Sequence, residues 1–438
     1  MKKILISMAL FLSVGTIMGQ VVDKAALKAL QKEAKAQMAE AQKINEALVA
    51  KINDKSATEE LIMTECKKGQ ALVRKAIKGG GIDASKLGEA YKLSADLANQ
   101  VNNILLKKSS SLKEPIDTLY FLSNLNTLTS ALQGEIQNTK ITKGEAGNEN
   151  YIKNRKFNLA KSGDLYLYAA QLMSESNKYD KALEAFDKAM SYATIFPEVA
   201  DQVELSVPAD QIAYYAYLTA YEAKMYDKMD ALYDQAVQFK DGAQGVTQRK
   251  AVSFLERKDS VGWEKFVREL TISNPKENED YIQNLIGHYL KKDKEAGPDS
   301  NLLLPYVDEV LAKDPTIYIA QYGKAYKFFD SEKYDEAFEA YKKCTEIKDD
   351  SYEAWYQCGF SLYRKALALN SKVSSIKNQT EAKKALENVK TIMNDAIPYF
   401  EKARELAPDE PQKWAYELKQ CYSVTGQAAK AAEMDKLL

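Results

Sequence analysis

The sequence predicts an all-α fold made of helical hairpins that repeat along the chain. Apolar residues recur three and four positions apart through most of its 438 residues, which is the period of one face of a helix. Only 10 prolines interrupt this pattern, which leaves room for long helices. Small and aromatic residues also return together at intervals of about 34 residues, as in a repeat protein.

The bulk composition is that of a globular protein with balanced charge. Charged residues make up 28% of the chain and hydrophobic residues 45%. Lys and Arg together number 61 and Asp and Glu 62, so the formal net charge is −1. Nothing in this balance favours a nucleic-acid partner.

The first 19 residues predict an export signal. Lys2 and Lys3 precede an apolar run over residues 4–14, and small or polar residues follow near Gly19. The run is too short to span a membrane, so we expect a cleaved signal, with a retained anchor as the alternative. No cysteine follows it for lipid attachment, and the remaining chain lacks an apolar run of transmembrane length. We therefore expect an exported protein in the periplasm or associated with the outer membrane of a gram-negative-type cell.

Residues 20–138 predict an irregular helical region, which we interpret as a divergent cap of the repeat array. The expected elements are a long helix over 22–52, a second that Ser56 caps and that ends at Lys78, a third from Asp83 to Lys107, and a fourth with Pro115 in its first turn that ends near Asn138. Residues 139–150 are rich in Gly, Asn and charges without helical periodicity, so they predict a surface loop or hinge.

From Tyr151 onward a unit of two helices repeats to the end of the chain. Its second helix carries small and aromatic residues four and three positions apart, as in Ala337, Tyr341 and Cys344. Its first helix carries a bulky residue followed by small ones, as in Trp355, Cys358 and Gly359. The positions equivalent to Ala337 are 182, 229, 262, 303, 337, 396 and 431.

This pattern resembles the tetratricopeptide repeat, in about seven copies over residues 151–438. The resemblance implies a right-handed α-α superhelix whose concave face holds a protein or peptide partner. Positions 337 and 396 are separated by more than one period, which predicts a long inserted hairpin around residues 364–392 with a loop at 370–378. This hairpin should project beyond its neighbours, as a partner-binding element or as a neutral insertion.

The resemblance also places certain side chains on the concave face. Aromatic residues dominate the set, and they supply large contact area at a low cost in rotamer entropy. The expected residues are Leu167, Gln171, Tyr214, Tyr221, Tyr322, Tyr326, Tyr356, Phe360 and Tyr363. The alternative is that these tyrosines pack between repeats. The basic residues with which some family members clamp a carboxylate are not recognisable here.

No catalytic constellation is recognisable. His288 is the single histidine, and it lies in a helical segment where packing or a surface hydrogen bond explains it. Glycines 79–81 follow a helix rather than a strand, so they indicate a helix end and not a phosphate-binding loop. Paired carboxylates such as Glu332 and Asp335 lie in turns, and we expect no catalytic residue and no cofactor.

The four cysteines show neither metal-binding spacing nor a CxxC pair. They are Cys66, Cys344, Cys358 and Cys421. Cys344 and Cys358 lie on neighbouring predicted helices. They could form a disulfide, or each could be a buried free thiol, and the sequence leaves both alternatives open.

These observations favour a non-catalytic binding or scaffold protein with a protein or peptide partner. A glycan-binding protein that resembles the starch-binding outer-membrane family is the alternative, although only three tryptophans and no lipid-anchor cysteine are present. An enzyme is the third and weakest alternative.

Overall fold

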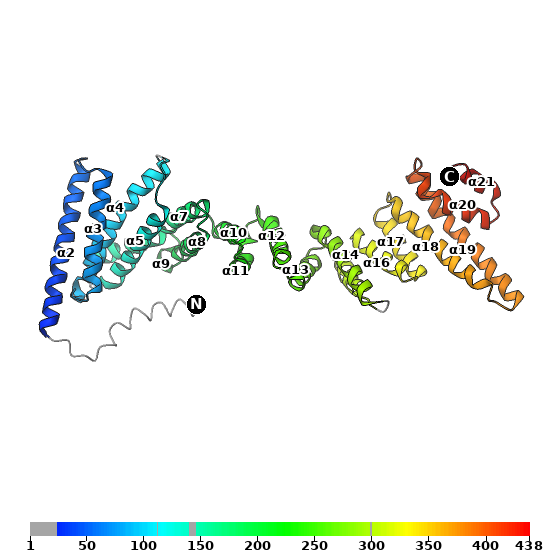
Figure 1. The fold of residues 1–438 in the computed structure, drawn as a ribbon, viewed down its shortest axis with the longest axis horizontal. Helices are drawn as coiled ribbons and strands as arrows, with labels where there is room; N and C mark the ends of the chain where they lie inside the picture. The colour runs from blue at the N-terminus through cyan, green and yellow to red at the C-terminus, as the bar shows by residue number, and fades with distance from the viewer. Residues whose placement is uncertain (1–23, 112, 140–145, 298–299) are drawn as a thin grey trace. The chain divides into compact units, whose positions relative to one another are not determined.

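A computed structural model describes residues 24–111, 113–139, 146–297 and 300–438 (Figure 1). Within these ranges the chain forms α-helices, a few 3-10 and π turns and no strand, which confirms the all-α fold class. The predicted export signal at residues 1–19 lies outside the described residues. None of the helices in the described ranges is long and apolar enough to cross a membrane.

The helices form two compact units, and the division does not fall where the sequence predicts a hinge. The first unit reaches to Ser253, and the second runs from Phe254 to Leu438. Residues 146–150, predicted as part of a loop, belong instead to α6 (Ala146–Lys161), which has the acidic Glu149 in its first turn. Residues 140–145 lie outside the described ranges. The cap and the first repeats share one hydrophobic core that contains Leu125 and Ala170, so they form one unit.

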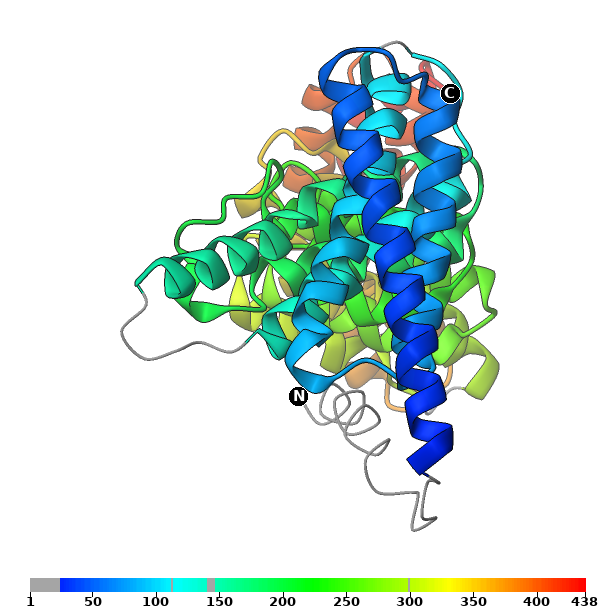
Figure 2. The same cartoon turned by 90° about the vertical axis from the view of Figure 1, so that its left-hand side faces the viewer.

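The N-terminal region contains four helices, each packed against the next (Figure 2 shows α2 and α3 side by side). They are α2 (Lys24–Asn53), α3 (Glu59–Lys78), α4 (Leu87–Leu106) and α5 (Thr118–Asn138). A 3-10 turn (Ala84–Lys86) leads into α4, and a π turn (Lys107–Ser111) follows it. The number and the order of these helices are as predicted.

Two predicted helix starts are displaced by a few residues because different side chains cap the helices. The cap of α3 is Thr58, whose side chain accepts a hydrogen bond from the Leu61 N–H, whereas Ser56 bonds to Asp54. Asp117 caps α5 by accepting from the Tyr120 N–H, so Pro115 precedes this helix instead of lying in its first turn.

Buried amides join three helices of this region. Asn124 of α5 donates to Asn102 Oδ1 (2.9 Å) and to the Ala98 carbonyl (2.8 Å) of α4. Gln70 of α3 donates to Asn124 Oδ1 (2.9 Å). All three side chains are buried, so these bonds fix how the helices are rotated against one another.

The remaining helices of the first unit begin the repeat array. They are α6, α7 (Gly163–Glu175), α8 (Tyr179–Ala193), the short α9 (Pro197–Ala200), α10 (Ala209–Glu222), α11 (Tyr226–Ala236) and α12 (Ala243–Glu256), the last of which extends past Ser253. α7 pairs with α8 and α10 with α11, and α8 also packs on α10.

The second unit continues the same arrangement. Its helices are α13 (Ser260–Ser273), α14 (Glu279–Ala296), α15 (Leu303–Lys313), α16 (Tyr318–Asp330), α17 (Tyr334–Ile347), α18 (Tyr352–Val373), α19 (Gln379–Leu406), α20 (Ala415–Val424) and α21 (Ala428–Asp435). α16 packs with α17, α18 with α19 and α20 with α21.

One turn geometry recurs between the two helices of a hairpin. A residue with positive φ closes the first helix, and the next N–H bonds to the carbonyl five residues earlier, which is a Schellman motif. The positive-φ residues of these turns are Asn177, Lys224, Lys258, Glu332 and Gly426. The bonds run from Lys178 to Met173, from Met225 to Ala220, from Asp259 to Phe254, from Lys333 to Phe328 and from Gln427 to Tyr422. The same turn joins α2 to α3 in the N-terminal region, through Lys55 and the bond from Ser56 to Lys51, so it is a shared way of ending a helix. The tetratricopeptide-like hairpins are identified by their helix pairs, which are α7 with α8, α10 with α11, α16 with α17 and α20 with α21.

Seven helix positions are predicted to be equivalent, and five of them, Ala182, Met229, Leu303, Ala337 and Ala396, are inaccessible to solvent. Gly262 is half-buried and Ala431 is 9% exposed. The long hairpin is also present, because α18 and α19 have 22 and 28 residues against 13 and 14 in α16 and α17. Its loop is shorter than predicted, since residues 370–373 continue α18 and only 374–378 connect the helices.

The four cysteines are free and buried in the core. Burial raises the pKa of the Cys66, Cys344 and Cys421 thiols to about 12 and also raises the pKa of Cys358. We therefore expect no reaction of the native protein with a thiol reagent at pH 8, because both access and thiolate are lacking. After unfolding in urea without a reductant, a colorimetric thiol assay should count four thiols. A count of two would show that Cys344 and Cys358 are oxidised.

Candidate binding groove

The predicted site residues lie on the first helices of their hairpins, and the structure distributes them over both units. Tyr214 and Tyr221 lie on α10 of the first unit. The other five aromatic residues lie on α16 and α18 of the second unit. Each group is therefore considered within its own unit.

In the first unit a groove of about 590 Å³ lies between α7 and α10. Both predicted residues of α7, Leu167 and Gln171, line it. Its other lining residues are Asp164, Tyr168, Ser174, Glu175, Phe186, Ser206, Val207, Tyr215, Leu218 and Thr219. Apolar and aromatic side chains thus form much of its wall, two carboxylates belong to it, and no Lys or Arg lines it.

The tyrosine of α10 that lines this groove is Tyr215, the neighbour of the predicted Tyr214. Tyr214 instead packs against Phe239, with ring centroids 5.1 Å apart, and a Cβ on Gly242 would lie only 2.4 Å from its ring. Tyr221 lies under the guanidinium of Arg249, 5.8 Å from its ring centroid. Both predicted residues thus contact the segment that follows α11, which matches the packing alternative.

Three polar contacts connect the walls of the groove. Asp164 at the start of α7 accepts hydrogen bonds from the N–H and the Oγ of Ser206, both at 2.8 Å. At the other end, Ser174 Oγ of α7 lies 3.3 Å from Thr219 Oγ1 of α10. These contacts link the two walls of the groove near both ends of α7.

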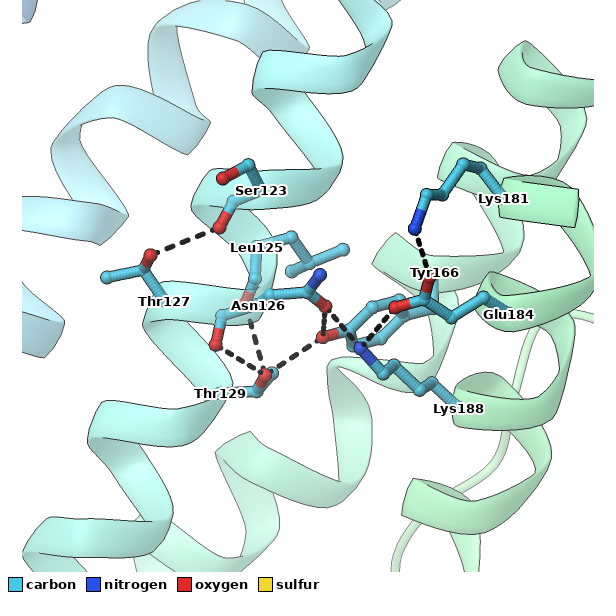
Figure 3. A network of polar contacts seen from close by, with 9 residues as sticks. All are labelled: Ser123, Leu125, Asn126, Thr127, Thr129, Tyr166, Lys181, Glu184 and Lys188. Carbon is cyan, nitrogen blue, oxygen red and sulfur yellow. Dashed lines mark hydrogen bonds and ion pairs between the residues drawn. The ribbon is translucent and has the colours of Figure 1, made fainter. Parts of the chain in front are cut away.

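α7 is held from behind by Tyr166, whose side chain is inaccessible to solvent (Figure 3). Its hydroxyl bonds to Thr129 Oγ1 (2.9 Å) and donates to Asn126 Oδ1 (2.7 Å), both on α5. Lys188 of α8 donates to the same Asn126 oxygen (2.6 Å) and to Glu184 (3.1 Å). This network fixes α7 between α5 and α8, so Leu167 and Tyr168 are presented by a rigid helix.

The aromatic residues of α18 form a stripe in which the rings stack on one another. Tyr352, Tyr356, Phe360 and Tyr363 follow each other with centroid separations of 5.9, 5.5 and 6.1 Å. Phe329 of α16 stacks on Phe360 at 5.5 Å. Tyr352, Tyr356 and Phe360 are half-buried and Tyr363 is buried, so the members of the stripe pack mainly against one another and against Phe329.

The two predicted residues of α16 differ in their exposure. Tyr322 is half-buried against Tyr318 and Tyr341, with centroids 5.9 and 5.3 Å apart. Tyr326 is 42% exposed and is thus free for contact with a partner. His288 has the surface hydrogen bond that the sequence suggests, with Nε2 3.0 Å from Glu264 Oε2.

The sequence missed Tyr215, Leu218 and Tyr168 as groove residues. On α7 the residues Leu167 and Gln171 are four apart and Tyr168 adjoins them on the same face, so the helical period alone could have added it. On α10 neither predicted residue lines the groove, so the helical period could not be counted from a correct position. An error of one residue in the assignment rotates the expected side chain by about 100° around the helix.

No protein-family model and no curated protein sequence matches this chain. Among solved structures, it is similar to a monomeric mutant of IFIT1 with Gppp-AAAA, at 15% identity over 82% of this chain and 74% of that one, with a TM-score of 0.31. It is also similar to the human IFIT1 dimer with m7Gppp-AAAA, at 14% identity over 91% of this chain and 72% of that one, with a TM-score of 0.25. For the TPR domain of P58(IPK), the identity is 12% over 89% of this chain and 99% of that one, and the TM-score is 0.24. TM-scores this low do not establish a common fold, and the tetratricopeptide-like architecture rests on the hairpins of this chain.

Replacing Tyr166 with Phe should destabilise the first unit. The substitution removes a buried hydroxyl that has two partners, so we expect a loss of about 1–3 kcal/mol in the free energy of unfolding. Tyr341→Phe is the matched control, since Tyr341 is equally inaccessible but its hydroxyl has no hydrogen-bond partner in the described part of the chain. This second change should be neutral or stabilising. Urea denaturation followed by circular dichroism measures both, and the opposite order would contradict the assignment.

Glu417 should make stability depend on pH. Burial raises the pKa of its carboxyl, and its backbone hydrogen bond and the Tyr356 hydroxyl offset this only in part. The folded state thus favours the protonated form, so this group's contribution is complete below about pH 4 and is lost as the pH rises through the raised pKa. Glu417→Gln should raise the thermal midpoint at pH 7 but not at pH 3. The exposed control Glu346→Gln should raise neither, and equal effects of the two variants would refute the explanation.

Proposed function

We propose that this protein is an exported, non-catalytic binding or scaffold protein of the cell envelope, which holds a segment of a partner protein in the groove between α7 and α10. The observation that carries the proposal is the groove itself. Its volume of about 590 Å³ is in the range of specific binding sites, and apolar and aromatic side chains lie beside a few polar groups.

The charges of the groove indicate which segment it would accept. Asp164 and Glu175 are its charged lining residues, and no cation lines it. A nucleic acid would require Lys or Arg against its phosphates, so this surface suits a peptide better. We propose an apolar segment flanked by a basic residue, with apolar side chains against Leu167, Tyr215 and Leu218 and the cation near Glu175.

A glycan partner is the second candidate, since Tyr168 and Tyr215 line the groove. Sugar rings bind by lying flat on open aromatic faces. The largest aromatic set, the α18 stripe, is half-buried or buried in contacts among its own members, which favours the protein partner. The export signal predicted from residues 1–19 supports placing this binding role in the periplasm or at the outer membrane.

A photo-crosslinking amino acid in place of Gln171 tests the groove. In intact cells it should capture one partner in the envelope fraction, whereas the same group in place of the exposed Tyr416 in the second unit should not. A synthetic peptide from the crosslinked segment should then bind the purified full chain and show the predicted apolar and basic character. Recovery of the chain in the cytoplasm would contradict export.

The double substitution Leu167→Ala with Tyr215→Ala should weaken that peptide's binding at least about tenfold, as removal of central contacts does. Tyr416→Ala is the matched control and should leave the Kd unchanged. Unaltered binding by the folded double variant would exclude the groove. Binding of a polysaccharide instead of the peptide in calorimetry would establish the glycan alternative.

A further inference from the structure

A second pocket lies on the first unit, at the junction of the N-terminal region and the repeats. It has a volume of about 390 Å³. Its lining comes from α4 (Ala95, Asp96, Asn99), α5 (Leu128, Leu132), α6 (Arg155, Asn158, Lys161) and the start of α7 (Ser162, Asp164, Leu165). It shares only Asp164 with the groove described above.

Arg155 is the best-positioned group of this pocket. Its Nε donates to Glu135 Oε1 and to the Tyr151 hydroxyl, both at 3.2 Å. Glu135 is 1% exposed and also accepts from Tyr151, so the guanidinium is oriented from inside the protein. No hydrogen bond within the described residues uses its two Nη groups. The contact nearest to them is an ion pair, with 3.6 Å between Nη2 and Asp96 Oδ1.

Most of the other polar groups of the pocket have few polar partners. Within the described residues, the Asp96 carboxylate makes no polar contact besides that ion pair, and the Lys161 ammonium makes none besides its position 6.0 Å from the ring centroid of Phe157. The side-chain amides of Asn99 and Asn158 make no hydrogen bond to a described residue. Asp164 differs, because Ser206 satisfies its carboxylate.

The pocket therefore presents the Asp96 carboxylate beside the two cations Arg155 and Lys161, next to an apolar wall formed by Leu128, Leu132 and Leu165. A simple anion would face two carboxylates in this pocket. A purely apolar ligand would cover charged groups without satisfying them, which is unfavourable. A zwitterion satisfies both signs, and the 3.6 Å between Arg155 and Asp96 suits opposite charges carried on one carbon atom.

We propose that this pocket binds an α-amino acid with an apolar side chain. The carboxylate is held by the Nη groups of Arg155, with Lys161 nearby, and the ammonium group by Asp96. The side chain lies against Leu128 and Leu132. This site is independent of the proposed partner groove, because it is tested with a small ligand alone.

Calorimetry on the purified full chain with L-leucine as the probe tests the site. L-leucinamide, which lacks the carboxylate, and 4-methylpentanoate, which lacks the ammonium group, are the matched ligands. Leucine should bind at least about tenfold more tightly than either, since each analogue leaves one charged partner unsatisfied. No saturable binding of leucine, or equal binding of all three ligands, would overturn the proposal.

The variant Asp96→Asn tests whether Asp96 binds the ammonium group of the ligand or only maintains the shape of the pocket. This variant should lose about tenfold or more in affinity for leucine while its affinity for 4-methylpentanoate stays the same or rises, because only the ammonium partner is removed. Asp180→Asn is the control, since Asp180 forms an ion pair of similar length (3.7 Å to Lys228) outside the pocket. A parallel loss for both ligands in Asp96→Asn, or the same loss in Asp180→Asn, would contradict the assigned role of Asp96.

Discussion

Each helical hairpin of this chain has an apolar face that it cannot cover alone, and the rest of the structure depends on this constraint. Inaccessible small residues such as Ala182, Ala337 and Ala396 let helices approach closely, and aromatic rings fill the space between them. The recurring Schellman turn returns the chain for the next helix at the same geometry. Surface for ligands is therefore left in two kinds of place. One is where the first helices of neighbouring hairpins face each other, and the other is where the repeats pack against the N-terminal helices.

α7 lies at such a junction, and because of its helical period its side chains point in three directions: into the core, into the groove and toward the polar pocket. Tyr166, Ala169 and Ala170 face the core, where the buried polar network fixes the helix. Leu167 and Gln171 face the groove, and Asp164 lines both the groove and the polar pocket. One rigid helix thus supports two candidate sites of different character, one largely apolar with acidic groups and one with balanced charge.

The many aromatic residues have mainly a packing role. The stacked stripe on α18, the contact of Tyr214 with Phe239 and the buried Tyr341 use ring surface within the protein. An abundance of 27 tyrosines therefore indicates how the hairpins are joined more than what they bind. Ring position, and not ring number, distinguishes Tyr215 as a groove residue.

The sequence by itself determined the all-α class, the four helices of the N-terminal region in their order, most of the buried small positions of the repeats and the long hairpin of α18 and α19. These features depend on local causes, which are the helical period, turn residues and small residues at fixed spacing. Only the tertiary structure decided that the N-terminal region shares a core with the first repeats and that Tyr215, not Tyr214, lines the groove. It alone also brought Asp96 of α4 beside Arg155 of α6. These three outcomes depend on how helices rotate about their axes and on which distant segments meet, and packing sets both across the whole unit.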